Sequence, residues 1–403
     1  MRWKQRHGGF PRTKLRARGL FTFVPRQSQK RCSLEKLSNN EMQRAGLLLA
    51  LILSIFAAGC GSSPQPPPPA PQLLETGWVI SYDTPAVILH TADGGQHWSA
   101  QGDSALWAGC SGTDISTVDD YTAWAAVGCT EGGKILHTDN GGAEWSVQPL
   151  PEGVGEMKNI KGLSRDVAWA VTLDGTVLRT TTGGNVWTIM PHSVPISQVN
   201  RMDALGLPSS NVWIADDQGG HWGIIHTPDN GATWRREYVP YEVKVTTGGM
   251  HMVSGYSPMV AWSAVWGEGY LFRTIDGGGT WTQVATLGSF GDVDDMCALS
   301  ADTVWAIQNH SGDNGGVIYH VVLEDGQPVI DSFNPASNYT YQGIACADDQ
   351  AMVAVGYRGV SVDPSLPPGV IVSTKDGGQT WFSQPLSVDD AHFTKVSFVG
   401  AHR

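Results

Sequence analysis

The sequence predicts an all-β fold, a seven-bladed β-propeller of four-stranded antiparallel blades that is closed by its C-terminal strand. A short phrase, T-x-[D/N/T]-[G/N]-G-x-x-W, recurs at intervals of 42 to 47 residues, apart from one gap of 100. An apolar, strand-like segment containing Trp precedes each copy. Because two markers keep one register at a period typical of propeller blades, the chain after residue 76 is interpreted as a ring of repeats.

The recurring phrase has the composition of a tight turn between two strands. Its Gly pair permits positive φ, its short polar third residue can accept turn N–H bonds, and its Trp can fold back between strands. The third positions are Asp93, Asn140, Thr182, Asp229, Asp276 and Asp376, and the last positions are Trp98, Trp145, Trp187, Trp234, Trp281 and Trp381. We expect structural roles for all of them, because they lie on different blades at the rim and cannot converge on one substrate.

The long gap hides one further repeat. Residues 317–327, VIYHVVLEDGQ, keep a strand and a turn but lack the Trp. The preceding Trp marker counts the same number of units, with Met352 in the seventh place. The Trp positions are Trp78, Trp124, Trp169, Trp213, Trp262 and Trp305.

The two ends of the repeat region complement each other. The first unit begins at its second strand, at Gly77, and the chain finishes with FTKVSFVG (393–400), which reads like a first strand. We therefore expect a propeller over residues 77–403 in which the tail completes the first blade and removes two open sheet edges.

Residues 1–59 are predicted to be a leader with a lipoprotein signal peptide. The apolar run 45–59 is too short to span a bilayer and is typical of a signal-peptide core. It ends in AAGC (57–60), which resembles the lipobox of bacterial lipoproteins, and that resemblance implies a lipid on Cys60. Met42 begins a signal peptide of ordinary length, so it is an alternative translation start.

Residues 60–76 are Pro-rich and are predicted to be a semi-rigid tether between the membrane and the propeller. The chain after Cys60 carries 14 Lys and Arg against 36 Asp and Glu. Such a surface repels phosphate backbones, so we expect no nucleic-acid partner. The predicted protein is an exported monomer anchored at the cell envelope, on the outer membrane if the cell is Gram-negative.

Four cysteines follow Cys60, and export favours their oxidation. Cys110 and Cys129 flank the first turn of the second unit, where directly opposed strand residues approach disulfide geometry. Cys297 and Cys346 lie in the first strands of adjacent units and form a second candidate bridge. Two buried thiols are the alternative for this pair.

The repeat phrase resembles the Asp-box, or BNR repeat, of sialidases and related propellers. The longer unit AWAAVGCTEGGKILHTDNGGAEW (123–145) looks more like the propeller of photosystem II assembly and stability factors. This resemblance implies a non-catalytic platform for partner proteins. That family uses an Arg-rich patch, whereas this chain has only eight Arg after Cys60, so a generic binding or assembly role is what the resemblance implies here.

Enzymatic alternatives were weighed on the same residues. A sialidase-like site needs three converging Arg and an R-I-P motif; that motif is absent, and Arg179 and Arg273 occupy repeat positions. The cluster Asp292, Asp294 and Asp295, placed before the first strand of the sixth blade, keeps a xyloglucanase-like hydrolase as the alternative. The His of the ILHT and IIHT segments lie on separate blades, so we expect no metal and no cofactor.

Extra aromatic residues lie in longer segments between strands. They form a candidate binding face for protein or glycan, or they fill the interfaces between blades. These residues are Trp107, Trp222, Trp266, Tyr256, Tyr339 and Tyr341. The sequence thus predicts a non-enzymatic scaffold that binds a protein or glycan partner, with a glycoside hydrolase on the same fold as the alternative.

Overall fold

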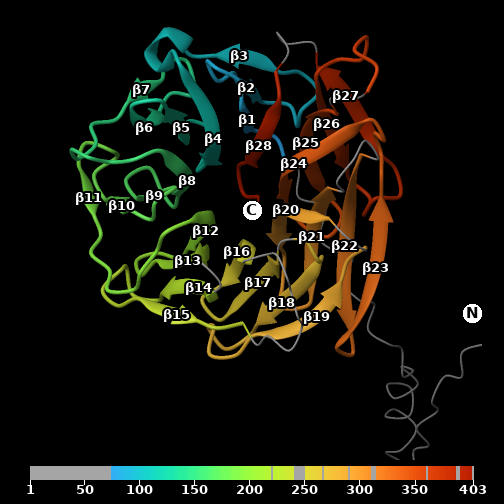
Figure 1. The fold of residues 1–403 in the computed structure, drawn as a ribbon. Helices are drawn as coiled ribbons and strands as arrows, with labels where there is room; N and C mark the ends of the chain where they lie inside the picture. Colours follow the sequence, from blue (N-terminus) through green and yellow to red (C-terminus); the bar gives the residue numbers. More distant parts are fainter. Residues whose placement is uncertain are drawn as a thin grey trace, which may run out of the picture. The chain divides into compact units, whose positions relative to one another are not determined.

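The computed structural model describes residues 74–218, 221–239, 250–265, 267–288, 291–309, 315–359, 362–386 and 391–401. The leader, Cys60 and nearly all of the tether lie outside these residues. Within them, seven four-stranded antiparallel sheets surround a central axis (Figure 1), which confirms the predicted propeller. One short 3-10 helix, η1 (Ser104–Trp107), accompanies the strands. No helix in this described part is long and apolar enough to cross a membrane.

Each blade runs from an inner strand at the axis to an outer strand at the rim. From the first blade to the seventh, the inner strands are β28 (Phe393–Phe398), β4 (Cys110–Thr117), β8 (Met157–Gly162), β12 (Val199–Leu205), β16 (Met250–Ser257), β20 (Asp292–Ala298) and β24 (Tyr339–Cys346). The second strands are β1 (Gly77–Ser81), β5 (Ala123–Cys129), β9 (Ala168–Thr172), β13 (Asn211–Gln218), β17 (Val260–Val265), β21 (Thr303–Asn309) and β25 (Met352–Arg358). The third strands are β2 (Ile88–Thr91), β6 (Gly132–Thr138), β10 (Val177–Thr180), β14 (His221–Thr227), β18 (Tyr270–Thr274), β22 (Gly316–Glu324) and β26 (Gly369–Thr374). The outer strands are β3 (Ser99–Gln101), β7 (Ser146–Val147), β11 (Trp187–Ile189), β15 (Arg235–Glu237), β19 (Thr282–Thr286), β23 (Gln327–Phe333) and β27 (Phe382–Leu386).

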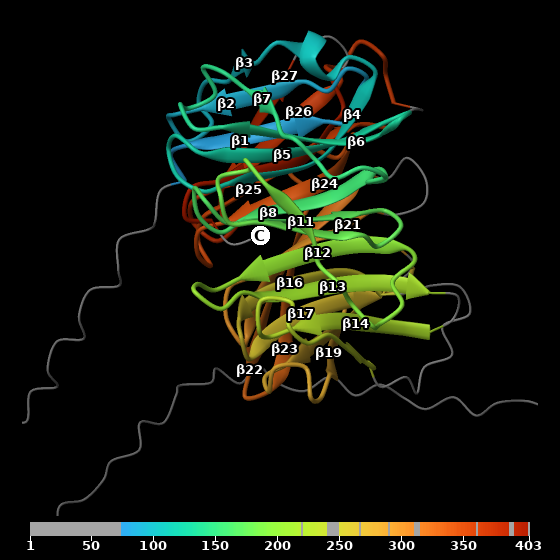
Figure 2. The same ribbon diagram turned by 90° about the vertical axis from the view of Figure 1, so that its left-hand side faces the viewer.

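The C-terminal strand closes the ring. β28 pairs antiparallel with β1, with Val396 opposite Val79. The pairing is extended at both ends, because Tyr82 N donates to His392 O and Val399 N donates to Thr76 O, each at 2.9 Å. The predicted closure is thereby confirmed. Seen from the side in Figure 2, inner strands of adjacent blades such as β8 and β12 lie next to each other.

The recurring phrase forms the turn between the third and fourth strands. In the fourth blade, Thr233 N donates to Asp229 Oδ1 at 2.8 Å and Gly231 N donates to Thr227 Oγ1 at 2.9 Å. The Thr227 hydroxyl in turn donates to Asp229 Oδ1. Hydrogen bonds from Thr233 hold the pKa of the Asp229 carboxyl below its ordinary value. The short polar side chain therefore satisfies the turn's own N–H groups, as the residue pattern indicates.

The Trp of the second strand stacks on the residue opposite it in the third strand. Trp124 pairs with His137, and their rings stack at 3.8 Å. Trp187, from the turn of the next blade, meets Trp124 edge-on at 5.8 Å. In the third blade the same place is taken by Arg179, whose guanidinium lies 5.2 Å from the ring of Trp169. These His and Arg residues therefore support the packing between blades.

The sixth blade lacks the turn Trp, as the sequence indicates. Its third and fourth strands meet in a tight hairpin at Asp325 and Gly326, with φ of 51° and 77°. In the neighbouring fifth blade, Trp262 donates from Nε1 to Ser300 O at 2.9 Å.

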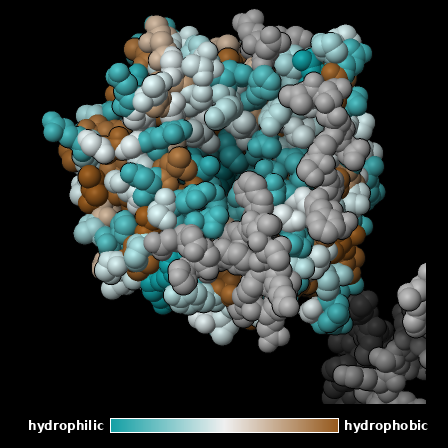
Figure 3. All heavy atoms as spheres, viewed as in Figure 1, coloured by the Kyte–Doolittle hydropathy of each residue, from teal (hydrophilic) through white to brown (hydrophobic). Residues whose placement is uncertain are grey.

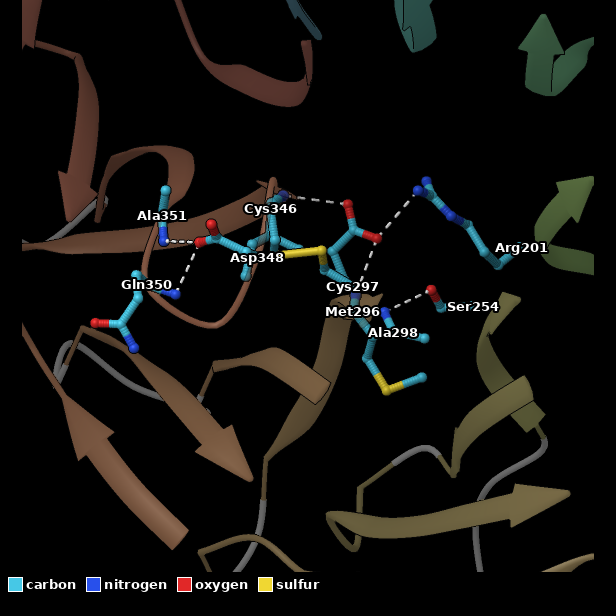
Figure 4. The surroundings of a disulfide bond; sticks show 11 residues. Arg201, Ser254, Met296, Cys297, Ala298, Cys346, Asp348, Gln350 and Ala351 are labelled. Atoms are coloured by element: carbon cyan, nitrogen blue, oxygen red, sulfur yellow. Dashed lines mark hydrogen bonds and ion pairs between the residues drawn. A yellow bond between two sulfur atoms is a disulfide. The ribbon is translucent and has the colours of Figure 1, made fainter. Parts of the chain in front are cut away.

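Two disulfides join inner strands to their neighbours. Cys110 and Cys129 face each other across β4 and β5 with a Cα–Cα distance of 4.2 Å. Cys297 on β20 is bonded to Cys346 on β24, with a Cα–Cα distance of 6.2 Å. This second bond links the sixth and seventh blades at the axis (Figure 4).

Candidate binding site in the central channel

Every inner strand contains a β-bulge near its start, and β16 has a second register shift near its end. At these points the register with the second strand shifts by one residue, which leaves that residue without a direct partner and turns its side chain away from the ladder. The seven bulged residues are Thr394, Thr113, Lys158, Asn200, His251, Asp294 and Gln342. All seven are polar, and we refer to them as the bulge ring.

The bulge ring lines one mouth of the central channel. The cavity there has a volume of about 380 Å³, and each of the seven bulged residues contributes to its wall. Glu156, Tyr82 and Leu173 add to the rim. Figure 3 shows hydrophilic residues gathered around a hollow at the centre of the ring. The seven blades thus place hydrogen-bonding groups around a single polar cavity.

The floor of this mouth is a buried ion network centred on Arg201. This side chain extends from β12, and its Nη2 lies 3.1 Å from Asp295 Oδ1 on β20. Its Nη1 lies 3.8 Å from Asp114 Oδ1 on β4. Lys395 on β28 completes the network, with Nζ 3.2 Å from Asp295 Oδ2 and 2.9 Å from Gln342 O. Figure 4 shows Arg201 pointing toward the carboxylate beside the Cys297–Cys346 disulfide.

Polar side chains on the inner strands also bond the backbone of the next blade. Each such bond gives an inner-strand N–H a side-chain acceptor on the inner strand of the preceding blade. The acceptors and donors are Asp114 Oδ2 with Ile160 N (3.0 Å), Asn159 Oδ1 with Met202 N (3.1 Å), Asp203 Oδ2 with Gly255 N (2.8 Å), Ser254 Oγ with Ala298 N (3.0 Å) and Ser397 Oγ with Thr117 N (2.9 Å). Buried polar side chains around the axis therefore connect neighbouring blades.

Burial perturbs the ionisable groups of the channel. It lowers the pKa of Lys395 to about 8 against the opposing pull of Asp295. It lowers the pKa of His251 to about 4, and it lowers the pKa of Lys158, with a further contribution from Arg201. For Asp294, burial raises the pKa to about 7, although a hydrogen bond from Asn309 opposes the rise. Burial therefore makes the charged forms of these mouth residues less favourable than they are in water.

This perturbation predicts a pH-dependent stability difference for Asp294→Asn. The folded-state pKa of Asp294 lies above the unfolded value. The protonated carboxyl therefore contributes to the stability of the folded protein at low pH, and this contribution is lost as pH rises through about 7. We expect the variant to gain roughly 2 to 4 kcal/mol relative to wild type between pH 4 and pH 8. Urea unfolding at both pH values measures this. Exposed Asp349→Asn is the control, and an equal gain there would contradict the assignment.

Three of the candidate binding aromatics lie in the interior, as the alternative of filling the blade interfaces expects. Trp107 is 1% exposed and donates from Nε1 to Ala86 O at 2.9 Å, so it fills the interface between the first two blades. Tyr339 and Tyr341 are buried, and their hydroxyls bond backbone atoms. Tyr256 is 41% exposed. The side chain of Trp222 and all of Trp266 lie outside the described residues.

The acidic cluster of the sixth blade needs correction. Asp292, Asp294 and Asp295 belong to β20 itself and do not precede it. The strand's pleat and bulge separate their environments: Asp292 Oδ1 accepts Gly267 N, Asp294 faces the mouth and Asp295 binds the floor cations. The aspartates of the turns lie on separate blades and are not brought together. The described residues contain no group of His, Cys, Asp and Glu suited to a metal ion.

The bulge ring and the Arg201 network were not found from the sequence. One signal was present: the bulged polar residue directly follows an apolar or aromatic residue in six of the seven first strands, and it follows Gly112 in the remaining one. Only the closed ring shows that these positions face one cavity.

The structure thus defines the chain as a closed propeller with a polar channel mouth and a charge-balanced floor. A sequence model of the family described as photosynthesis system II assembly factor YCF48 matches residues 74–292, more than half of the chain. The chain therefore belongs to this family. A search of curated proteins finds no significant match.

Solved structures resemble the chain in fold. A structure described as YCF48 bound to D1 peptide is 19% identical and covers 72% of this chain and 90% of its own, with a TM-score of 0.55. The GH74 xyloglucanase of Xanthomonas campestris is 13% identical, covers 82% of this chain and 56% of its own, and has a TM-score of 0.52. A streptogramin B lyase is 14% identical, with 71% and 87% covered and a TM-score of 0.53. At these identities the likeness concerns the fold alone.

Proposed function

We propose that this chain is a non-enzymatic, lipid-anchored scaffold that binds a protein partner outside the cytoplasm. The observation that carries the proposal is the bulge ring, which presents seven polar side chains in one mouth. The charged side chains beneath it form ion pairs with each other. Family membership supports an assembly role, and a solved relative is described as bound to a peptide. The two disulfides suit an oxidising compartment.

A glycoside hydrolase is the second candidate, because Asp294 and Glu156 line the same cavity. Burial raises the pKa of Asp294 to about 7, as a general acid requires. Against this reading, Tyr82 is the single aromatic residue among the described cavity-lining residues. Sugar-binding clefts rely on aromatic faces, so the scaffold is favoured.

The test is capture of partners from native membranes by the full-length chain carrying a C-terminal tag. We expect the wild type and an exposed control, Asp349→Ala, to recover the same partner. The mouth variant Asn200→Ala/Gln342→Ala should recover at least tenfold less. Equal recovery by the mouth variant, or sugar hydrolysis by the pure protein without a recovered partner, would overturn the proposal.

Anchoring is tested separately by Cys60→Ser. The variant should move from the membrane fraction to the soluble extracytoplasmic fraction, and mass spectrometry should show acylated Cys60 in the wild type alone. An unchanged membrane fraction would contradict the lipid anchor and leave the binding test unaffected.

A further inference from the structure

Two ionisable side chains in the channel mouth have no close counter-ion among the described residues. Lys158, on the bulge of β8, is half-buried and makes no hydrogen bond or close ion pair with any described residue, and the carboxylates of Glu156 and Asp114 act on it only at longer range. Asp294, on the bulge of β20, accepts a hydrogen bond from Asn309 Nδ2 at 2.7 Å but has no cation within ion-pair distance among the described residues. Each charge is therefore only weakly compensated by the protein itself.

The two charges face the cavity from opposite sides. β8 belongs to the third blade and β20 to the sixth, so they stand three blades apart in a ring of seven. The bulged residues between them carry no charge at neutral pH: Asn200 and His251 on one side, and Thr113, Thr394 and Gln342 on the other. The mouth therefore has a cationic side, an anionic side and uncharged hydrogen-bonding groups between them.

The floor balances its own charges and reaches Lys158 and Asp294 only at longer range. Arg201 and Lys395 face Asp114 and Asp295, so two cations meet two carboxylates. Glu156, on the rim two residues before Lys158, also lines the cavity, which weighs against a site for a simple anion. A lone anion or a lone cation would compensate one side of the mouth and leave the other unpaired.

We propose that the channel mouth binds a compact zwitterion of the amino-acid or dipeptide class, with its carboxylate on Lys158 and its ammonium on Asp294. Such a ligand compensates both charges at once, and its polar backbone can bond the Asn and Gln of the ring. The cavity of about 380 Å³ lies within the range of small-ligand sites. The ligand would occupy the same mouth as the protein partner proposed above, but its two ionic contacts use Lys158 and Asp294, which the Asn200→Ala/Gln342→Ala capture variant leaves unchanged.

Isothermal titration of the purified mature chain tests the proposal, with glycine, 4-aminobutyrate and glycylglycine as zwitterions and acetate and methylammonium as single ions. We expect saturable binding of at least one zwitterion and at least tenfold weaker binding of both single ions. Lys158→Met and Asp294→Asn should each weaken zwitterion binding at least tenfold. The matched controls, Lys375→Met and Asp349→Asn, change exposed charges outside the mouth and should bind like wild type.

The conservative variants Lys158→Arg and Asp294→Glu separate a binding role from a folding role. Both retain the charge, so binding should stay within a few-fold of wild type, and circular dichroism checks the fold of every variant. Absence of saturable binding, acetate binding as tight as zwitterion binding, or an equal loss in the control variants would overturn the proposal. None of these outcomes bears on partner capture from membranes.

Discussion

Deleting residues 391–403 is expected to prevent the propeller from forming its native closed ring. These residues contain β28, the inner strand of the first blade, and Phe393, Val396 and Phe398 are at most 1% exposed. Burying such side chains contributes about 1.5–3 kcal/mol each. Their sum approaches the whole stability of a domain, about 5–15 kcal/mol. The truncated chain should therefore lose its near-ultraviolet circular dichroism and its cooperative thermal transition.

The loss should be reversible in trans if the missing strand is its cause. A synthetic peptide of residues 391–403 can pair with the exposed edge of β1 through the same backbone bonds. We expect its addition to restore the cooperative transition in a concentration-dependent manner. A truncated chain whose free energy of unfolding lies within about 1 kcal/mol of that of the full chain would contradict the closure argument.

The blade count and the ring closure could be predicted because the packing between blades imposes a local pattern. Six of the seven blades place a buried Trp at the same position, so Trp124 and its equivalents recur at the repeat period, and Met352 takes this position in the seventh blade. Each turn needs a short acceptor such as Asp229 beside Gly residues. These requirements lie within segments of a few residues, which a single sequence displays directly.

The channel could not be predicted in the same way, because its residues come from seven segments about 45 residues apart. Arg201, Asp295 and Lys395 read as scattered polar residues in β-strands, and only the ring brings them together. The location of the additional aromatic residues could not be decided from the sequence for a related reason. A long inter-strand segment suggests a loop, but Trp107 lies in a short 3-10 helix that is folded over the blade interface.

The Asp295 carboxylate is expected to be among the most sensitive single positions in the protein. One carboxylate oxygen pairs with Arg201, whose side chain is 4% exposed, and the other pairs with Lys395, whose side chain is 13% exposed. Asp295→Ala leaves both cations without this partner in a buried site, which costs about 3–5 kcal/mol. Denaturant unfolding measures the loss. As a control, Arg165→Met breaks an exposed pair with Asp119 and should cost no more than about 1 kcal/mol.

A double variant distinguishes unbalanced charge from lost packing at this site. Asp295→Asn/Lys395→Met removes one negative and one positive charge and leaves Arg201 with Asp114. If the penalty of the Asp295 variants arises from uncompensated cations, the double variant should be more stable than Asp295→Asn alone, with a coupling of about 1–3 kcal/mol. If the double variant is less stable than either single variant, the loss of stability arises from packing, and the proposed role of charge balance at this site is contradicted. Because the same four charges bridge the first, second, fourth and sixth blades, their balance is a condition for a closed ring with a polar mouth.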